Sequence, residues 1–200
     1  MIHLKLINAL LKPGLAFKNI AKSDSYSVGL LQKTVPFLLI FPPLFIWLGS
    51  NLFGWRLGAD EPLMMARESL IIISLGYFWV LVVGLITTSI ISQWMATTYG
   101  AAASLGRHMA LITIVGEPLA IGSLAHLFPN VFMNILVMIP AMIWAMYLLY
   151  KGIPIVLGIP PERGMLMASA LVGWLLVAAV SLLGMSMMFW TLGVGPLLGV

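Results

Sequence analysis

Five long runs of the chain are almost purely apolar, and polar stretches separate most of them. A helix needs roughly 20 mostly apolar residues to cross the hydrocarbon core of a bilayer. Because hydrocarbon offers no partner for unpaired backbone groups, each run is predicted to be a helix rather than a lone strand. The predicted spans are residues 35–53, 69–92, 109–127, 130–150 and 165–190.

The first 33 residues have a different, two-sided pattern, in which lysines recur at helical spacing among Ile, Leu and Phe. Such a pattern is typical of an amphipathic helix in the cytoplasmic interface, with its lysines toward anionic headgroups. A second interpretation stays open, in which this segment packs over the ends of the helix bundle. The lysines assigned to the lipid surface are Lys5, Lys12, Lys18 and Lys22.

Composition supports the same class of protein. Hydrophobic residues make up 62% of the 200 positions and charged residues only 8%. Soluble domains are about a quarter charged, so this chain has too few polar residues to cover a water-facing surface. We therefore expect an all-α integral membrane protein. A cytoplasmic amphipathic segment, residues 1–33, precedes a transmembrane domain of five helices, residues 34–192.

The basic residues predict the orientation of the chain in the membrane. With a cytoplasmic N-terminus and a periplasmic C-terminus, eight of the ten Lys and Arg residues fall on the cytoplasmic side, as the positive-inside rule requires. The net charge of +4 thus reflects topology and gives no reason to expect a nucleic-acid partner. The cytoplasmic residues are Lys5, Lys12, Lys18, Lys22, Lys33, Arg107, Lys151 and Arg163, and the other two are Arg56 and Arg67.

One carboxylate lies inside an apolar run. Glu117, in the stretch IVGEPLAIG, falls near the middle of the third predicted span. Carboxyl groups at this depth are costly and usually face the interior of the bundle. No Lys or Arg is predicted at that depth, so a protonated, neutral Glu117 that donates a hydrogen bond is expected.

Prolines interrupt three of the spans at similar predicted depths. Each interior proline lacks an amide donor and frees a backbone carbonyl one turn earlier. Two interpretations of Glu117 and its prolines stay open: a structural hydrogen bond between kinked helices, or a proton- or cation-responsive site of the kind that transporters build from broken helices. The prolines of this candidate site are Pro42, Pro43, Pro118 and Pro140.

No pattern predicts catalysis, a metal site or a cofactor. The chain has no cysteine, and its 14 methionines favour flexible packing over copper binding. Ser123 and His126 are one turn apart on one helix, but no third residue orients the histidine, so a nucleophile–base pair is not expected. His126 and His108 are instead predicted to lie at headgroup level, at the two ends of the third span. The chain is predicted not to be an enzyme.

Two stretches carry a family resemblance. YLLYKGIPIVLGIPPERG, Tyr147 to Gly164, joins the fourth span to the fifth, and KPGLAFKNI, Lys12 to Ile20, lies in the N-terminal segment. Together with five spans they resemble the Yip-type (Ypt-interacting protein) membrane family, and within it the YohC-like bacterial inner-membrane members. This resemblance implies a five-helix fold in a bacterial cytoplasmic membrane.

The same resemblance limits what can be expected of function. Eukaryotic members are associated with Rab-type GTPases and carry an Asp-Leu-Tyr-Gly-Pro-like motif before the first span. The corresponding stretch here, SYSVGLLQKTVP, lacks that motif, so GTPase binding is not expected. We predict a non-enzymatic protein that organises the membrane or binds a partner, with the lipid bilayer, a second copy or another membrane protein as candidate partners. The alternative is a small transporter or channel for a proton, metal ion or small solute, built on Glu117 and the interrupted helices.

Overall fold

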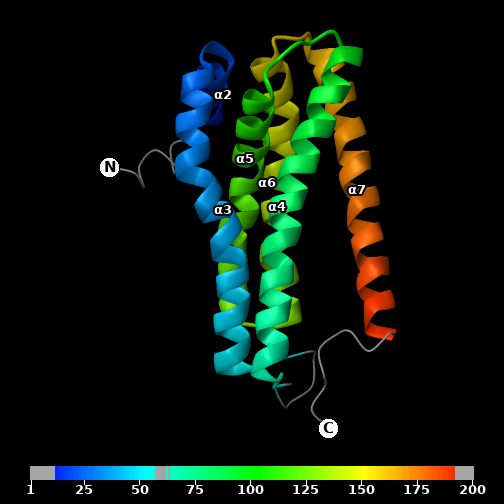
Figure 1. The fold of residues 1–200 in the computed structure, drawn as a ribbon. Helices are drawn as coiled ribbons and strands as arrows, with labels where there is room; N and C mark the ends of the chain where they lie inside the picture. Colours follow the sequence, from blue (N-terminus) through cyan, green and yellow to red (C-terminus); the bar gives the residue numbers. More distant parts are fainter. Residues whose placement is uncertain (1–11, 57–61, 63, 192–200) are drawn as a thin grey trace.

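The apolar runs form long helices that stand side by side in the computed structural model of the chain (Figure 1). The structure describes residues 12–56, 62 and 64–191. These residues contain no strand, and five of their helices are long and apolar enough to cross a membrane. The elements are α2 (Pro13–Lys22), α3 (Asp24–Phe53), α4 (Arg67–Thr98), α5 (Leu105–Gly122), the 3-10 helix η1 (Ser123–Leu127), α6 (Val131–Leu157) and α7 (Pro161–Thr191). The expected all-α membrane bundle is confirmed.

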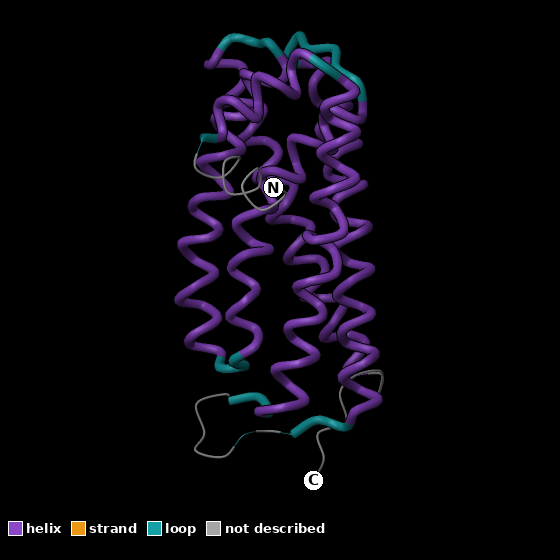
Figure 2. The backbone as a smooth tube through the Cα atoms, turned by 90° about the vertical axis from the view of Figure 1, so that its left-hand side faces the viewer, coloured by secondary structure: helices purple, strands orange, loops and turns teal. Residues whose placement is uncertain are grey.

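The helices extend beyond the apolar runs that predict them, mainly at the end of the bundle that carries α2. There α3 begins at Asp24, not near residue 35, and α6 continues to Leu157. The side chain of Ser23 accepts a hydrogen bond from the Tyr26 amide and caps α3, and Ser104 caps α5 in the same way. Hydropathy marks only the part of a helix that suits hydrocarbon, whereas caps and turns decide where the helix itself ends. In Figure 2 the loops lie at the ends of the helices.

Helix α5 is the centre of the bundle and packs against α3, α4 and α6. Glycines allow these helices to approach closely. A β-carbon built on Gly116 would lie 2.7 Å from the Leu38 side chain of α3, and one on Gly122 would lie 3.1 Å from Ala141 of α6. Small residues at such contacts let membrane helices pack backbone to backbone.

Helix α2 packs its apolar side against α5 and α6. Phe17 and Ile20 are completely buried, and the Phe17 ring lies against Gly152 of α6. The interfacial helix expected in the N-terminal segment is therefore not confirmed, and this geometry agrees with the second interpretation, packing over the bundle ends. Three of the lysines assigned to the lipid surface, Lys12, Lys18 and Lys22, are exposed on α2 or beside it, whereas Lys5 lies outside the described residues.

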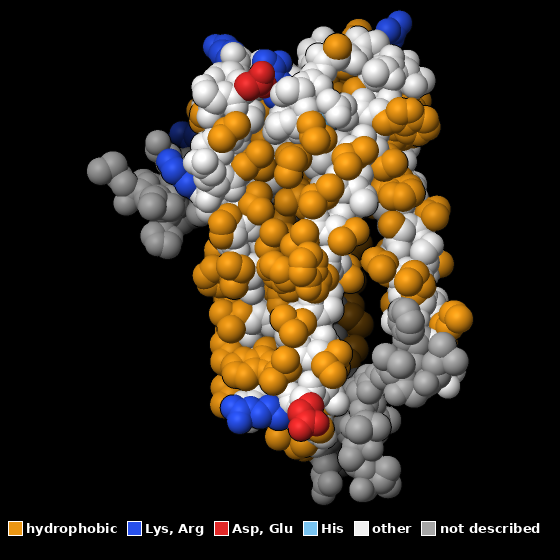
Figure 3. Space-filling model, in the orientation of Figure 1, with side chains coloured by type: hydrophobic (Ala, Val, Ile, Leu, Met, Phe, Trp, Pro, Cys, Tyr) orange, Lys and Arg blue, Asp and Glu red, His pale blue; other side chains and the backbone are white. Residues whose placement is uncertain are grey.

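Charged side chains gather toward the two ends of the bundle, and an apolar surface separates them (Figure 3). At the α2 end, Arg107 Nε donates to Asp24 Oδ1 at 2.7 Å, and the Ser104 hydroxyl donates to the same oxygen at 2.9 Å. These contacts tie the start of α3 to the start of α5. Asp24 is largely exposed, so we expect the pair to fix geometry more than stability.

Candidate functional site

Glu117 lies in the interior of the bundle. Its side chain is 1% exposed, and Thr113, one turn earlier on the same face of α5, is fully buried. Neither carboxyl oxygen of Glu117, nor the Thr113 hydroxyl, has a hydrogen-bond partner among the described residues. A buried polar group without a partner is costly. Within the described part of the chain, Ser50, Ser74 and His108 Nε2 also lack partners, but Glu117 and Thr113 are the two such side chains that lie one turn apart on one helix.

Three of the four candidate prolines lie within about 6 Å of the depth of Glu117. Leu38 of α3 lies against Gly116 of α5, and Gly49 of α3 lies against the backbone of Leu127. The two residues of each pair are 78 positions apart, so α3 runs parallel to the α5–η1 segment. This register places Leu39 level with Glu117. Pro42 and Pro43 are buried on α3, and they remove the amide donors that would otherwise bond to the carbonyls of residues 38 and 39.

Pro118 and Pro140 are placed differently. Pro118 is buried beside Glu117 and frees the carbonyl of Ile114 on α5 itself. Pro140 of α6 has an exposed side chain. Gly152 of α6 lies against Leu111 of α5, and Ala141 lies against Gly122, so the two helices are antiparallel and Pro140 is level with residue 123. Pro140 is therefore six residues, or about 9 Å, farther from the α2 end than Glu117 is. The structure thus brings Pro42, Pro43 and Pro118 toward Glu117 and leaves Pro140 on the surface.

The histidines do not occupy equivalent positions. His108 is fully buried, and its Nδ1 lies 2.9 Å from the Ser92 hydroxyl of α4, so its side chain faces the interior of the bundle, and its level in the membrane stays a prediction. No sequence pattern predicts this contact, because it depends on how α4 and α5 are rotated toward each other. His126 is half-buried at the end opposite α2 and is hydrogen-bonded to Asn134. The Ser123 hydroxyl donates to the Ala120 carbonyl at 2.6 Å, so it is engaged by its own helix.

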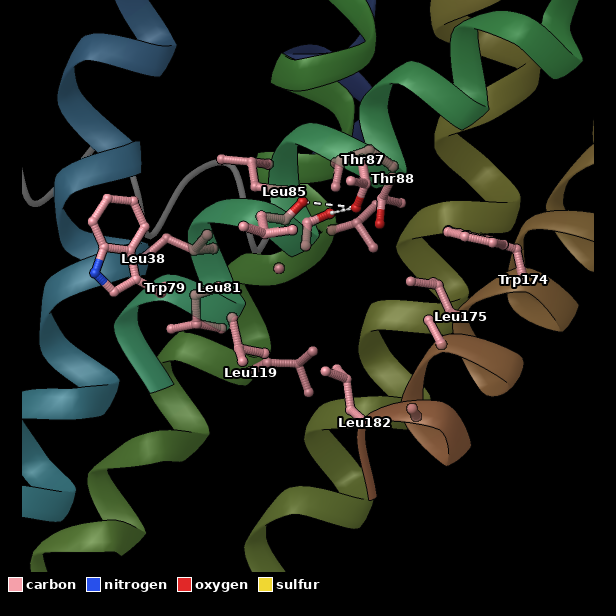
Figure 4. A pocket seen from close by; sticks show the side chains of 18 of the residues that line it. Leu38, Trp79, Leu81, Leu85, Thr87, Thr88, Leu119, Trp174, Leu175 and Leu182 are labelled. Atoms are coloured by element: carbon pink, nitrogen blue, oxygen red, sulfur yellow. Dashed lines mark hydrogen bonds between the residues drawn. The ribbon is translucent and has the colours of Figure 1, made fainter. Parts of the chain in front are cut away.

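An apolar groove of about 640 Å³, which no sequence pattern predicts, lies beside α5. Its walls come mainly from α4, α5 and α7, and it lies at the middle of their length (Figure 4). It forms because α7 diverges from the rest of the bundle toward its C-terminal end, which leaves a hollow beside α4 (Figures 1 and 3). Its principal lining residues are Leu38, Trp79, Gly84, Leu119, Trp174 and Leu182.

The groove offers little for a polar ligand. Thr87 and Thr88 are the lining residues that carry hydroxyl groups. The Thr87 hydroxyl already donates a hydrogen bond to the Val83 carbonyl, at 2.7 Å. Gly116 lines the groove, but its neighbour Glu117 does not. The buried carboxyl and the groove are therefore two separate features, on different sides of α5.

Comparisons with known proteins agree with this architecture. The Yip1 domain model matches residues 7–194. Inner membrane protein YohC of Escherichia coli (strain K12) is 27% identical over 164 residues, which cover 82% of this chain and 81% of that protein. Inner membrane protein YohC of Escherichia coli O6:H1 (strain CFT073) matches with the same identity and coverage. No solved structure matches the chain. The five-helix membrane bundle described above thus belongs to the Yip1 domain family.

Proposed function

We propose that this protein is a non-enzymatic component of the bacterial cytoplasmic membrane that organises the bilayer by holding a lipid acyl chain in the groove between α4, α5 and α7. The groove is the observation that carries the proposal. Its lining is almost wholly apolar, and it sits at the middle of three helices long enough to span a membrane.

The chemistry of the lining selects the occupant. A polar solute would leave its donors and acceptors unpaired against leucine, valine and alanine side chains, which costs free energy. An acyl chain has no such groups and gains dispersion contacts with the walls. From Trp79 to Thr88 the α4 wall is about 14 Å long, close to half of the roughly 30 Å hydrocarbon core and so to the reach of one acyl chain.

Lipid acyl chains can reach the groove directly from the surrounding bilayer. The faces of α4 and α7 outside the groove carry exposed apolar side chains, among them Ile86, Ile90, Leu176 and Val180. In a bilayer these surfaces contact acyl chains, so the same chains have direct access to the space between the two helices. This geometry supports lipid binding and gives no support to movement of a polar solute through the groove.

The location and orientation are part of the proposal. Both relatives are named inner membrane proteins, which supports a bacterial inner membrane for this chain. The N-terminus is proposed to be cytoplasmic, since the α2 end of the bundle carries Arg107, Lys151 and Arg163 as well as the lysines of α2.

Filling the groove is expected to release the lipid. Gly84 of α4 lines the groove, and a β-carbon built on it would meet nothing within 4 Å, so Gly84→Phe projects a ring into the space without a backbone clash. Overpacking of a binding space costs typically about 1–3 kcal/mol, so we expect lipid affinity to fall about tenfold. The measurement is the phospholipid retained per protein after graded detergent washing, by native mass spectrometry.

Gly76→Phe is the matched control, because Gly76 lies on the same helix, has equally open space, and does not line the groove. It is expected to retain lipid as the unchanged protein does. Equal retention by Gly84→Phe and Gly76→Phe would refute the proposal. So would a photocrosslinker placed at Leu182 that captures another membrane protein in place of phospholipid, because the occupant would then be a partner helix.

A further inference from the structure

Several oxygen atoms that receive no hydrogen bond from any described residue lie near the buried face of α5 around Glu117. Two are the carboxyl oxygens of Glu117 and a third is the Thr113 hydroxyl, each without a partner among the described residues. The backbone adds carbonyls freed by prolines at nearly the same depth. These are the carbonyls of Ile114 on α5 and of Leu38 and Leu39 on α3.

Thr113, Ser50 and Ser74 have buried hydroxyls without a hydrogen-bond partner among the described residues, and of these three only Thr113 lies one turn from Glu117 on α5. Ser89 donates to the Leu85 carbonyl at 2.6 Å, and Ser123 and Thr87 bond to their own helices in the same way. This back-bonding is the usual way for Ser and Thr to satisfy their hydroxyls in a helix. Thr113 is as deeply buried and makes no such bond, which leaves its oxygen available to a ligand on the Glu117 side of α5.

The side of α3 that meets α5 near this cluster is mainly apolar, and its proline-freed carbonyls are the polar groups that it offers. Thr34, Leu38 and Pro42 form one buried stripe at four-residue spacing. Because Leu38 lies against Gly116, this stripe lies along α5 at the level of residues 112–120. The carbonyls freed by Pro42 and Pro43 therefore belong to the helix turn that packs beside Glu117.

No described cationic side chain compensates Glu117. On α5 itself, His108 is nine residues away on the opposite side of the helix, and it is bonded to Ser92. On α6, Lys151 bonds to the Tyr147 hydroxyl at 2.7 Å. On α4, Tyr77 is half-buried, and its ring lies 6.1 Å from that of His126. The other titratable side chains on α5 and on the elements packed against it are exposed, lie at helix ends or are hydrogen-bonded elsewhere: Lys18, Lys22, Asp24, Tyr26, Lys33, Arg67, Glu68, Arg107, His126, Tyr147 and Tyr150.

We propose that Glu117, Thr113 and the freed carbonyls of Leu38, Leu39 and Ile114 bind a monovalent alkali cation. Six oxygen atoms and no nitrogen or sulfur make up this set, and hard cations prefer oxygen ligands. Helices α3 and α5 continue through these prolines, which free the carbonyls without breaking the helices. Backbone carbonyls without amide partners are known sodium ligands in membrane helices. A bound cation supplies the positive charge that the buried carboxylate otherwise lacks and joins α3 to α5. This site is independent of the lipid groove.

Sodium is the probe for a thermal stability test on the full-length protein in detergent. A ligand that binds only the folded state raises its melting temperature. When sodium chloride replaces choline chloride at constant ionic strength, we expect the melting temperature to rise by about 4 °C or more between roughly 1 and 100 mM sodium. Glu117→Gln is expected to abolish this rise, and Thr113→Val to shift its midpoint about tenfold higher in sodium.

Glu162→Gln is the control, because Glu162 is exposed in the first turn of α7 and should leave the sodium response unchanged. If Glu117→Gln does not fold, Thr113→Val alone still decides the question, since an unmoved midpoint contradicts the site. A melting temperature that is equal in sodium, potassium and choline, or that varies with pH alone, overturns the proposal and leaves a protonated carboxyl. Lipid retention is expected to be the same in all three variants, so a negative result for the cation site would leave the proposed lipid groove unaffected.

Discussion

Gly49→Val is expected to lower the free energy of unfolding by about 3 kcal/mol or more. A β-carbon built on Gly49 would lie 2.8 Å from the carbonyl oxygen of Leu127 and closer still to that of His126. Both obstacles are backbone atoms of η1, so neither can rotate away as a side chain would. The valine would therefore push the end of α3 away from η1. Thermal unfolding in detergent, followed by tryptophan fluorescence, measures the loss.

The matched control is Gly29→Val on the same helix. A β-carbon on Gly29 meets nothing within 4 Å, and valine is a better helix former than glycine. We expect this variant to unfold at or slightly above the temperature of the unchanged protein. Equal effects at Gly49 and Gly29 would show that α3 and η1 are not in backbone contact, and the register used to place Leu39 beside Glu117 would then be wrong.

Phe17→Ala is expected to detach α2 from the bundle, at a cost of about 3–5 kcal/mol. The Phe17 ring is completely buried, and a β-carbon built on Gly152 would lie 2.9 Å from two of its carbon atoms. Removing the ring leaves a cavity between α2, α5 and α6. Because few other buried residues hold α2 in place, we expect local opening before global unfolding. Hydrogen exchange of the α2 amides, read by mass spectrometry, measures this.

Leu15→Ala in the same helix provides the comparison, since Leu15 is 62% exposed. If α2 packs over the bundle end, exchange in α2 rises strongly with Phe17→Ala and little with Leu15→Ala. If α2 instead lies on lipid with its apolar side down, the two substitutions should have similar effects. The second result would restore the interfacial helix that the sequence pattern suggests.

The five spans could be predicted from the sequence because crossing hydrocarbon is a strong local constraint. Each span needs a long apolar run, and polar stretches such as Gly54–Glu68 mark where runs end. The true helix ends could not be predicted in the same way. They depend on caps such as Ser23 and Ser104, which lie in polar segments that hydropathy leaves unassigned.

The candidate site was only partly predictable. A carboxylate in an apolar run predicts burial in any helix bundle, and Glu117 is buried. Which prolines lie beside it depends on helix rotation, which a single sequence does not specify. Pro140 faces outward on α6, whereas Pro42 and Pro43 face inward on α3. The contact of His108 with Ser92 was not predicted for the same reason, because Ser92 comes from a neighbouring helix.

The groove could not be predicted at all. Its lining comes from five helices, and its residues are mostly leucine, valine, alanine and tryptophan, which are ordinary in any membrane span. What creates the space is the divergence of α7 from α4, a property of tertiary packing. No single lining residue reveals this in the sequence.

Quenching of Trp174 by brominated phospholipid tests the lipid-binding groove most directly. Trp174 lines the groove, whereas Trp144 is 42% exposed on α6 and does not line it. Two variants, each keeping one of these tryptophans and carrying phenylalanine at the other six positions, are delipidated and titrated with lipid brominated at mid-chain. Saturable quenching of Trp174 at about one lipid per protein, lost in Gly84→Phe and absent from Trp144, is the predicted result. Quenching of Trp174 that merely follows the bulk lipid fraction, as at Trp144, would contradict the account.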